Sequence, residues 1–307
     1  MAYIIEDANV VSDHGIAIHS FLIHENKISH YGRSLKKYKG MRMNVSNYFM
    51  TPGHVMVDFN LLNNNLSEYK KHQLMLVSKG CTTVLVPCNI RYEFDFEKKI
   101  RYARHSMINS TIDYVMGLQL AAEKLSPTII RLCKRFKVPY IMAEVDEYTN
   151  ICSIPWGWIR DAQFQFQIPI YPLWKIEDKK VLKIQMELWE QITYSNNIPT
   201  FLHFPINHEI VPKVIRKQIG IYPKKGELLI GNKLDYNLYK YPEYETKVEE
   251  RNKLDYDTIE PIITIHKGRV LKANEEMNFF PGFGEELLVK IPGLFASIDN
   301  IGCSPHL

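Results

Sequence analysis

The sequence predicts an α/β protein with β-rich segments at both ends of the chain, and two patterns support this fold class. Between residues 52 and 220, apolar runs of strand length alternate with longer helical patterns, which is typical of βα units around a parallel sheet. Before and after this region, short apolar runs are separated by Asp, Asn and Gly, as in antiparallel β-structure. With 307 residues, of which 46% are hydrophobic and 23% charged, the chain can bury a large core.

The N-terminal segment has the pattern of a small β-unit. Apolar runs cover Tyr3 to Ile5, Ala17 to Ile23, Ile28 to Tyr31 and Phe49 to Met50. The break at Glu25-Asn26-Lys27 places turn-forming residues between two of these runs, so we expect a hairpin there.

Three helices are predicted in the central region, each with a start or stop signal. Asn65-Leu66-Ser67-Glu68 forms a capping box before a helix that should end at Gly80. Ser126-Pro127 combines an N-cap with a proline at the first helical position. The third helix is expected from about Asp178 to Tyr194, where apolar residues recur at helical spacing.

Strands are expected between and after these helices. The central region has six candidates, at His54 to Phe59, Thr82 to Val86, Ile112 to Leu118, Val138 to Met142, Ile168 to Tyr171 and Ile198 to Phe204. Beyond Gly220, the short apolar runs predict strands at Glu227 to Ile230, Tyr236 to Tyr239, Ile262 to His266, Val270 to Lys272 and Glu286 to Val289. The charged stretch Glu243 to Lys253 has the composition of a solvated loop.

Charge and cysteine usage exclude several functional classes. The net charge of +4 comes from scattered basic clusters without a single stripe, so no nucleic-acid partner is expected. The first residues include Glu6 and Asp7, and no apolar run is long enough for a signal peptide or a membrane span. The five cysteines have no paired short spacing, which argues against a disulfide framework or a zinc knuckle. We therefore expect a cytoplasmic protein without a membrane partner.

Several passages resemble the metal-dependent amidohydrolase superfamily, which includes dihydroorotase, imidazolonepropionase and adenine deaminase. Met43 to Gly53, ending in Thr51-Pro52-Gly53, is similar to the run that leads from the small β-domain into the first barrel strand. Ile219 to Tyr236, with Lys225-Gly226, Gly231 and Asp235, resembles the return into that domain. Gly80 to Val84 and Ile263 to Lys272 resemble the second barrel strand and the final strands.

The resemblance implies a TIM-type barrel with a small composite β-domain. Residues 1–51 and 221–307 would form the β-domain, and residues 52–220 the βα barrel-like domain. A complete barrel usually needs about 200 residues or more, so the central region predicts a shortened or open barrel. The alternative is an unrelated α/β domain in which Pro-Gly and Lys-Gly are ordinary turn residues.

The superfamily's metal-binding residues are mostly replaced in this chain. Active members carry His-x-His on the first strand, where residues i and i+2 share a face and can hold one metal. The register from Pro52-Gly53 places Asp58 and Asn60 at those positions, which offers oxygen in place of imidazole. Glu144 follows the fourth strand, and His203 ends the run Phe201-Leu202-His203 like the superfamily's fifth-strand histidine.

The candidate pocket therefore consists of Asp58, Asn60, Glu144 and His203. Each has a simpler interpretation as a solvated or hydrogen-bonded structural group. The superfamily also needs an Asp near the eighth strand as a proton acceptor, yet residues 203–220 contain only His208 and Glu209 as candidates. We therefore expect no catalytic residue and no bound metal. Asp58, His203 and Glu144 are the only metal candidates if one is present.

Three functional hypotheses remain. The first is a catalytically degenerate amidohydrolase-like protein, a pseudoenzyme, that binds a small ligand or a partner at the barrel mouth without a cofactor. The second is an active hydrolase of non-peptide C–N bonds in cyclic amides, ureas or amidines, with a rebuilt site and a divalent metal. The third is a homo-oligomeric scaffold protein.

Overall fold

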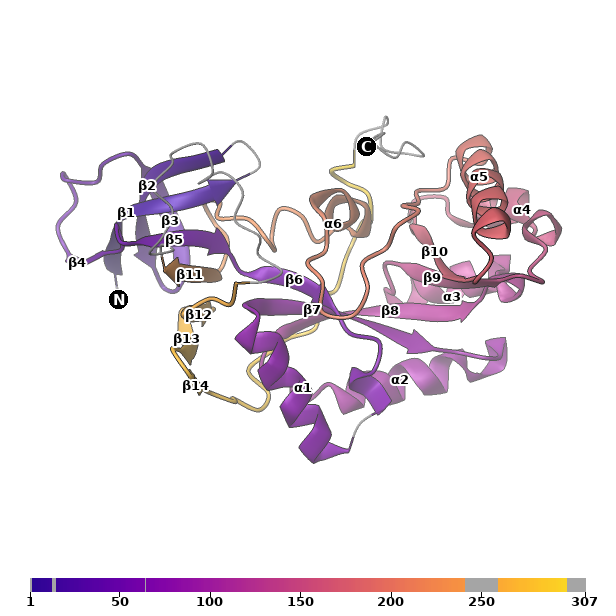
Figure 1. The fold of residues 1–307 in the computed structure, drawn as a ribbon, viewed down its shortest axis with the longest axis horizontal. Helices are drawn as coiled ribbons and strands as arrows, with labels where there is room; N and C mark the ends of the chain where they lie inside the picture. Colours follow the sequence, from indigo (N-terminus) through magenta and orange to yellow (C-terminus); the bar gives the residue numbers. More distant parts are fainter. Residues whose placement is uncertain (1, 13–14, 64, 241–258, 297–307) are drawn as a thin grey trace.

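The computed structural model describes residues 2–12, 15–63, 65–240 and 259–296. Two sheets form its framework, a mostly antiparallel one of nine strands and a parallel one of five, joined where the chain passes from β5 into β6 (Figure 1). The charged stretch Glu243 to Lys253 lies outside the described residues. In the described part of the chain, no helix combines the length and apolar character needed to cross a membrane.

The central region forms a curled, open half-barrel. Its strands are hydrogen-bonded in chain order, and every neighbouring pair is parallel. They are β6 (His54–Val57), β7 (Cys81–Asn89), β8 (Asp113–Ala121), β9 (Ile141–Asp146) and β10 (Ile170–Lys175). The predicted α/β class and the shortened, open barrel are thus confirmed.

The sixth predicted central strand, Ile198 to Phe204, is wrong. This segment runs beside β10, and the Ile170 amide donates to the Pro199 carbonyl at 2.9 Å. Pro199 has no N–H to return, and the Thr200 side-chain hydroxyl donates to the Ile170 carbonyl at 2.7 Å. A side chain thus replaces the backbone ladder, and the parallel sheet stops at five strands.

Helices connect the strands and cover one face of the half-barrel. They are α1 (Leu66–Ser78), α2 (Phe96–Ser106), α3 (Pro127–Phe136), α4 (Trp156–Ala162) and α5 (Lys179–Ser195), with single 3-10 turns at η1 (Leu61–Asn63), η2 (Glu93–Asp95), η3 (Ala122–Lys124) and η4 (Ile151–Ser153). The predicted caps are confirmed, because the Asn65 side chain accepts from the Glu68 amide and Ser126 accepts from the Ile129 amide. Helices α2 and α4 were not predicted.

The other face of the half-barrel is covered by α6 (Lys213–Ile219), which lies above the sheet in Figure 1 while α1 and α2 lie below it. Strand residues alternate between the two faces. Met56 packs in the cluster with the outer helices, whereas Val55 and Val57 pack in the cluster that contains Ile215 and Ile219. The inner face of the half-barrel is therefore a filled core.

The nine-stranded sheet contains strands from both ends of the chain. These are β1 (Ala2–Ser12), β2 (Gly15–His24), β3 (Lys27–Gly32), β4 (Met41–Asn44), β5 (Tyr48–Pro52), β11 (Tyr236–Lys240), β12 (Ile263–His266), β13 (Arg269–Ala273) and β14 (Glu276–Met277). Antiparallel pairing of β5 with β11 joins the N-terminal and C-terminal strands. The hairpin predicted at Glu25-Asn26-Lys27 connects β2 and β3.

Two predicted C-terminal strands are wrong. Residues 227–230 form turns and irregular backbone, and residues 286–289 contribute a single bridge from Glu286 to Tyr114. Leu228 of the first segment packs against the core of the nine-stranded sheet, whereas the second segment lies against the half-barrel, and neither forms a continuous ladder. Val289, for example, belongs to the inner-face core.

Buried charges connect the two sheets. Lys225 Nζ lies 2.7 Å from Asp113 Oδ2 on β8 and 2.6 Å from Asp235 Oδ2 next to β11. His266 Nδ1 lies 2.9 Å from Asp235, and Lys267 Nζ contacts Asp113 at 2.5 Å. Four of these residues, all except Asp113, belong to the superfamily-like passages, so those motifs serve here to join the β-domain to the half-barrel.

The network holds Asp113, Asp235 and Lys225 in their charged forms. Burial, the largest single influence, raises the pKa of both aspartates, but His266 and Lys225 more than reverse it. The pKa of Asp235 falls to about 2, and that of Asp113 falls well below its usual range. Burial lowers the pKa of Lys225, but the two carboxylates raise it above its ordinary value.

Candidate functional site

Asp58, His72 and His208, whose side chains are of types that commonly bind metals, form a cluster directly after β6. Asp58 is fully buried, and its Oδ2 lies 2.9 Å from His208 Nε2 and 3.5 Å from His72 Nδ1. One ligand atom from each residue lies within 4.8 Å of the other two. Two imidazoles and one carboxylate form a donor set that suits a divalent transition metal.

Different elements position the three side chains. Side chains alternate between the two faces along β6, so Asp58 lies on the same side as Met56, two residues before it. It points toward the outer helices and away from the inner face. His72 lies on α1 between the buried residues Tyr69 and Leu76, on the side of the helix that faces the sheet. His208 comes from the segment before α6, which bridges to the free edge of β6.

Hydrogen bonds and charge keep Asp58 ionised. Burial, the largest single influence, raises the pKa of this carboxyl. Hydrogen bonds from His208 and the Asn60 amide, together with the positive charge that His208 and His72 can carry, outweigh burial and lower the pKa below its ordinary value. Asp58 therefore presents a charged carboxylate to both histidines.

The other sequence-predicted site residues do not join this cluster. Asn60 is exposed, and its backbone amide donates to Asp58 Oδ1 at 2.8 Å. Glu144 on β9 accepts hydrogen bonds from Gln119 and from Lys175, each at 2.7 Å. His203 is exposed and makes no hydrogen bond or ion pair within the described residues.

The sequence interpretation missed His72 and underweighted His208. His72 sits three residues after Tyr69 and four before Leu76, so helical spacing alone could have placed it on the buried side of α1. His208 was noted only as a poor replacement for the missing Asp. Its position beside Asp58 follows from the pairing of residues 208–211 with β6, which no local pattern predicts.

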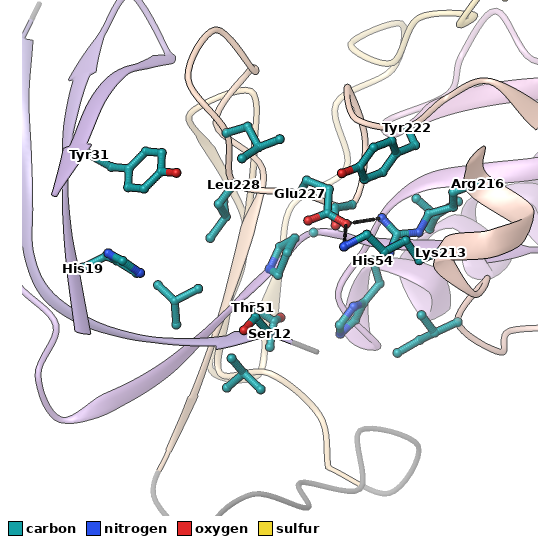
Figure 2. Close-up of a pocket in the computed structure, with 18 of the residues that line it drawn as sticks. Ser12, His19, Tyr31, Thr51, His54, Lys213, Arg216, Tyr222, Glu227 and Leu228 are labelled. Atoms are coloured by element: carbon teal, nitrogen blue, oxygen red, sulfur yellow. Dashed lines mark hydrogen bonds and ion pairs between the residues drawn. The ribbon is translucent and has the colours of Figure 1, made fainter. Parts of the chain in front are cut away.

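A cavity of about 560 Å³ lies between the nine-stranded sheet and α6 (Figure 2). His19 and Tyr31 approach it from the β-domain, while Lys213 and Arg216 approach it from α6. Glu227 lies between these two cations, with Oε1 at 3.4 Å from each. The cavity is thus lined by apolar and aromatic groups with a small charged cluster on one side.

Part of the cavity wall carries polar atoms without a partner among the described residues. Thr51 is only 4% exposed, and in this part of the chain neither its Oγ1 nor His19 Nδ1 has a hydrogen-bond partner. His54 also lines the cavity and is hydrogen-bonded to Tyr239. Burial, with a smaller contribution from the Arg216 charge, lowers the pKa of His54 to about 4, so this imidazole is neutral near pH 7.

Comparison with known proteins defines the fold. Dihydropyrimidinase from Brevibacillus agri superposes with a TM-score of 0.60 at 11% identity, over 95% of this chain and 100% of that one. L-Hydantoinase from Arthrobacter aurescens superposes with a TM-score of 0.59 at 13% identity, over 92% of this chain and 99% of that one. No protein-family model matches the chain.

One curated sequence adds to this likeness. Dihydropyrimidinase 1 of Caenorhabditis briggsae is 29% identical over 121 residues, which is 36% of this chain. The match covers 24% of that relative, so the chain spans about a quarter of its length. The resemblance seen in the sequence is thus confirmed at the level of the fold: this chain has a fold similar to that of hydantoinases and dihydropyrimidinases, with five parallel strands in its barrel-like sheet.

Proposed function

We propose that this chain is a small-molecule binding protein that keeps the hydantoinase fold without the hydrolytic chemistry of the superfamily. The observation behind this proposal is the filled inner face of the half-barrel. Active sites of barrel enzymes lie at the C-terminal ends of the barrel strands and in the loops that follow them. Here Ile215 and Ile219 of α6 pack on that face, and Tyr171 on β10 donates a hydrogen bond to Gln218 at 3.0 Å.

The residues at the superfamily's metal positions do not fit a metal in that place. Asn60 and His203 are exposed, and Glu144 already accepts a hydrogen bond from Lys175. Asp58 points away from the inner face. We therefore derive no hydrolytic step through a metal held at those four positions.

The cavity in Figure 2 is the binding site that we favour, in place of the barrel mouth expected from sequence. Its volume lies within the range of about 300–1,000 Å³ that small-ligand pockets occupy. Unpartnered polar atoms at Thr51 and His19 would gain hydrogen bonds from a ligand. Lys213, Arg216 and Glu227 form a charged edge beside the apolar lining, which favours a compact, partly apolar ligand that carries a charged group.

A small aromatic carboxylate fits this description, and calorimetric titration tests it. We expect benzoate or phenylacetate to bind more tightly than benzamide, which has a similar shape without the charge. Lys213→Met should weaken carboxylate binding about tenfold, since a hydrogen bond to a charged group contributes roughly 1.5 kcal/mol. Lys217→Met is the matched control, because Lys217 also lies over the Tyr222 ring but does not line the cavity.

Two outcomes would overturn the binding proposal. The first is the absence of binding by every carboxylate at millimolar concentration. The second is an affinity for carboxylates that stays at the wild-type value in both Lys213→Met and Thr51→Val. Circular dichroism and thermal scans of each variant would establish that the fold is retained.

An active hydrolase is the second candidate function, and the Asp58 cluster is the observation that favours it. The neighbours are named for hydantoins and dihydropyrimidines, so hydantoin and dihydrouracil are the substrates to test. We expect no ring opening above the buffer rate in the presence of added zinc or manganese. Turnover of either substrate by the wild-type protein that is lost in Asp58→Asn would make the hydrolase the favoured function.

A further inference from the structure

We propose that Asp58, His72 and His208 bind one divalent transition metal ion at the outer edge of β6. This inference goes beyond the proposed function and does not depend on it. Two of the three ligands lie off the barrel strands, one on helix α1 and one in the segment before α6. The ion would therefore lie between the first strand and its helix, outside the inner face of the half-barrel.

The distances between the ligand atoms suit a shared ion. Two ligands at about 2.0–2.1 Å from a tetrahedral zinc ion are roughly 3.3 Å apart. Asp58 Oδ2 lies 3.5 Å from His72 Nδ1 and 2.9 Å from His208 Nε2, on either side of that value. The three ligand atoms all lie within 4.8 Å of one another, so we infer that rotation of the imidazole rings would bring them to coordination distance.

His72 provides independent support, because its Nδ1 atom is buried and has no hydrogen-bond partner among the residues that the structure describes. The 3.5 Å separation from Asp58 Oδ2 is too long for a good hydrogen bond. A buried polar atom without a partner costs about 1–3 kcal/mol, so such atoms are uncommon unless another group satisfies them. A metal ion between the two atoms would satisfy both.

The surrounding backbone holds the other two ligands in place. Asp58 Oδ1 accepts from the Asn60 amide at 2.8 Å, which leaves Oδ2 directed toward the histidines. The His208 amide donates to the Val57 carbonyl at 2.9 Å, and His208 itself adopts a φ of 66°. This left-handed conformation costs about 1–2 kcal/mol in a residue other than glycine, and such strain is concentrated at functional sites.

The cluster is reachable from solvent on its histidine side. The side chains of His72 and His208 are 28% and 15% exposed, whereas Asp58 is fully buried. Three protein ligands leave further coordination positions open, as in catalytic rather than structural zinc sites. The site would thus hold an exchangeable metal that an external ligand can reach.

Metal content and affinity of the full-length protein test this inference. The protein is stripped with a chelator, incubated with zinc sulfate, desalted and analysed by elemental mass spectrometry and calorimetric titration. We expect about one retained equivalent of zinc. Cobalt(II) loading should give visible absorption bands typical of nitrogen and oxygen coordination. Both readouts are independent of any enzymatic activity.

Variants decide which residues hold the ion. His72→Gln should weaken zinc binding by at least about tenfold, and His208→Asn and Asp58→Asn should do the same. His203→Gln is the matched control, because this exposed histidine lies outside the cluster and should retain wild-type affinity. If the Asp58 or His208 variant fails to fold, His72→Gln decides alone, since it alters a partly exposed position on α1.

Three results would overturn the proposed metal site. They are retention of no zinc above the buffer level, wild-type affinity in His72→Gln, and loss of the tight zinc equivalent in His203→Gln. The last result would return the metal to the position expected from the superfamily. Ligand binding in the cavity of Figure 2 is measured separately, so either proposal can fail without the other.

Discussion

Replacement of Lys225 by Met should strongly destabilise the protein, because this lysine is the cation shared by the two sheets. Its side chain is 4% exposed, and Nζ lies 2.7 Å from Asp113 and 2.6 Å from Asp235. Methionine keeps most of the unbranched side chain but removes the charge. Both carboxylates would then remain buried with fewer compensating groups.

The expected loss is large but not complete. Removal of one partner from a buried ion pair costs about 3–5 kcal/mol, because the remaining charge is left without compensation. Lys267 still contacts Asp113 at 2.5 Å and His266 still contacts Asp235 at 2.9 Å, so we expect the lower half of this range. At roughly 2–4 °C per kcal/mol, the thermal midpoint should fall by about 6–16 °C.

Urea unfolding followed by tryptophan fluorescence and circular dichroism measures this change in the free energy of unfolding. Lys224→Met is the matched control, because the neighbouring lysine is exposed and its replacement should change stability by less than about 0.5 kcal/mol. If Lys225→Met were as stable as the control, the buried network would not hold the two sheets together. The role assigned to the superfamily-like motifs would then be wrong.

Three further predictions concern acid stability, a glycine and the C-terminal strands. Burial and the nearby Arg216 charge lower the pKa of His54 to about 4. Between about pH 6.5 and pH 4, the unfolded chain therefore binds a proton at His54 that the folded protein does not bind, and the free energy of unfolding decreases as the pH falls. His54→Gln should flatten that slope in urea titrations repeated across this interval. Gly53→Ala should lower the thermal midpoint, because a Cβ at this position would lie 2.3 Å from Thr82 Oγ1. Gly157→Ala is the control in the same thermal scans, because no atom lies within 4 Å of a Cβ placed at Gly157. Removal of residues 226–307 takes away β11 to β14 and should abolish cooperative unfolding; a soluble, cooperatively unfolding truncated chain would contradict this expectation.

Local signals in the sequence were sufficient to predict the fold class, most of the strands and several helix ends. The Asn65 and Ser126 caps each join residues three positions apart, so neighbouring residues are sufficient to predict them. The Pro52-Gly53 and Lys225-Gly226 passages carried the resemblance in the sequence. In the structure, Gly53 packs closely against Thr82 and Lys225 forms the buried ion pairs.

Only the tertiary structure decided the number of barrel strands, the filling of the inner face and the composition of the Asp58 cluster. Whether Ile198 to Phe204 becomes a strand depends on which groups of Thr200 and Ile170 meet across the sheet edge. Asp58 and His208 are 150 positions apart in sequence and are brought together by the return of the chain to β6. Periodicity and capping report contacts within a few residues, whereas such long-range contacts depend on how whole elements pack.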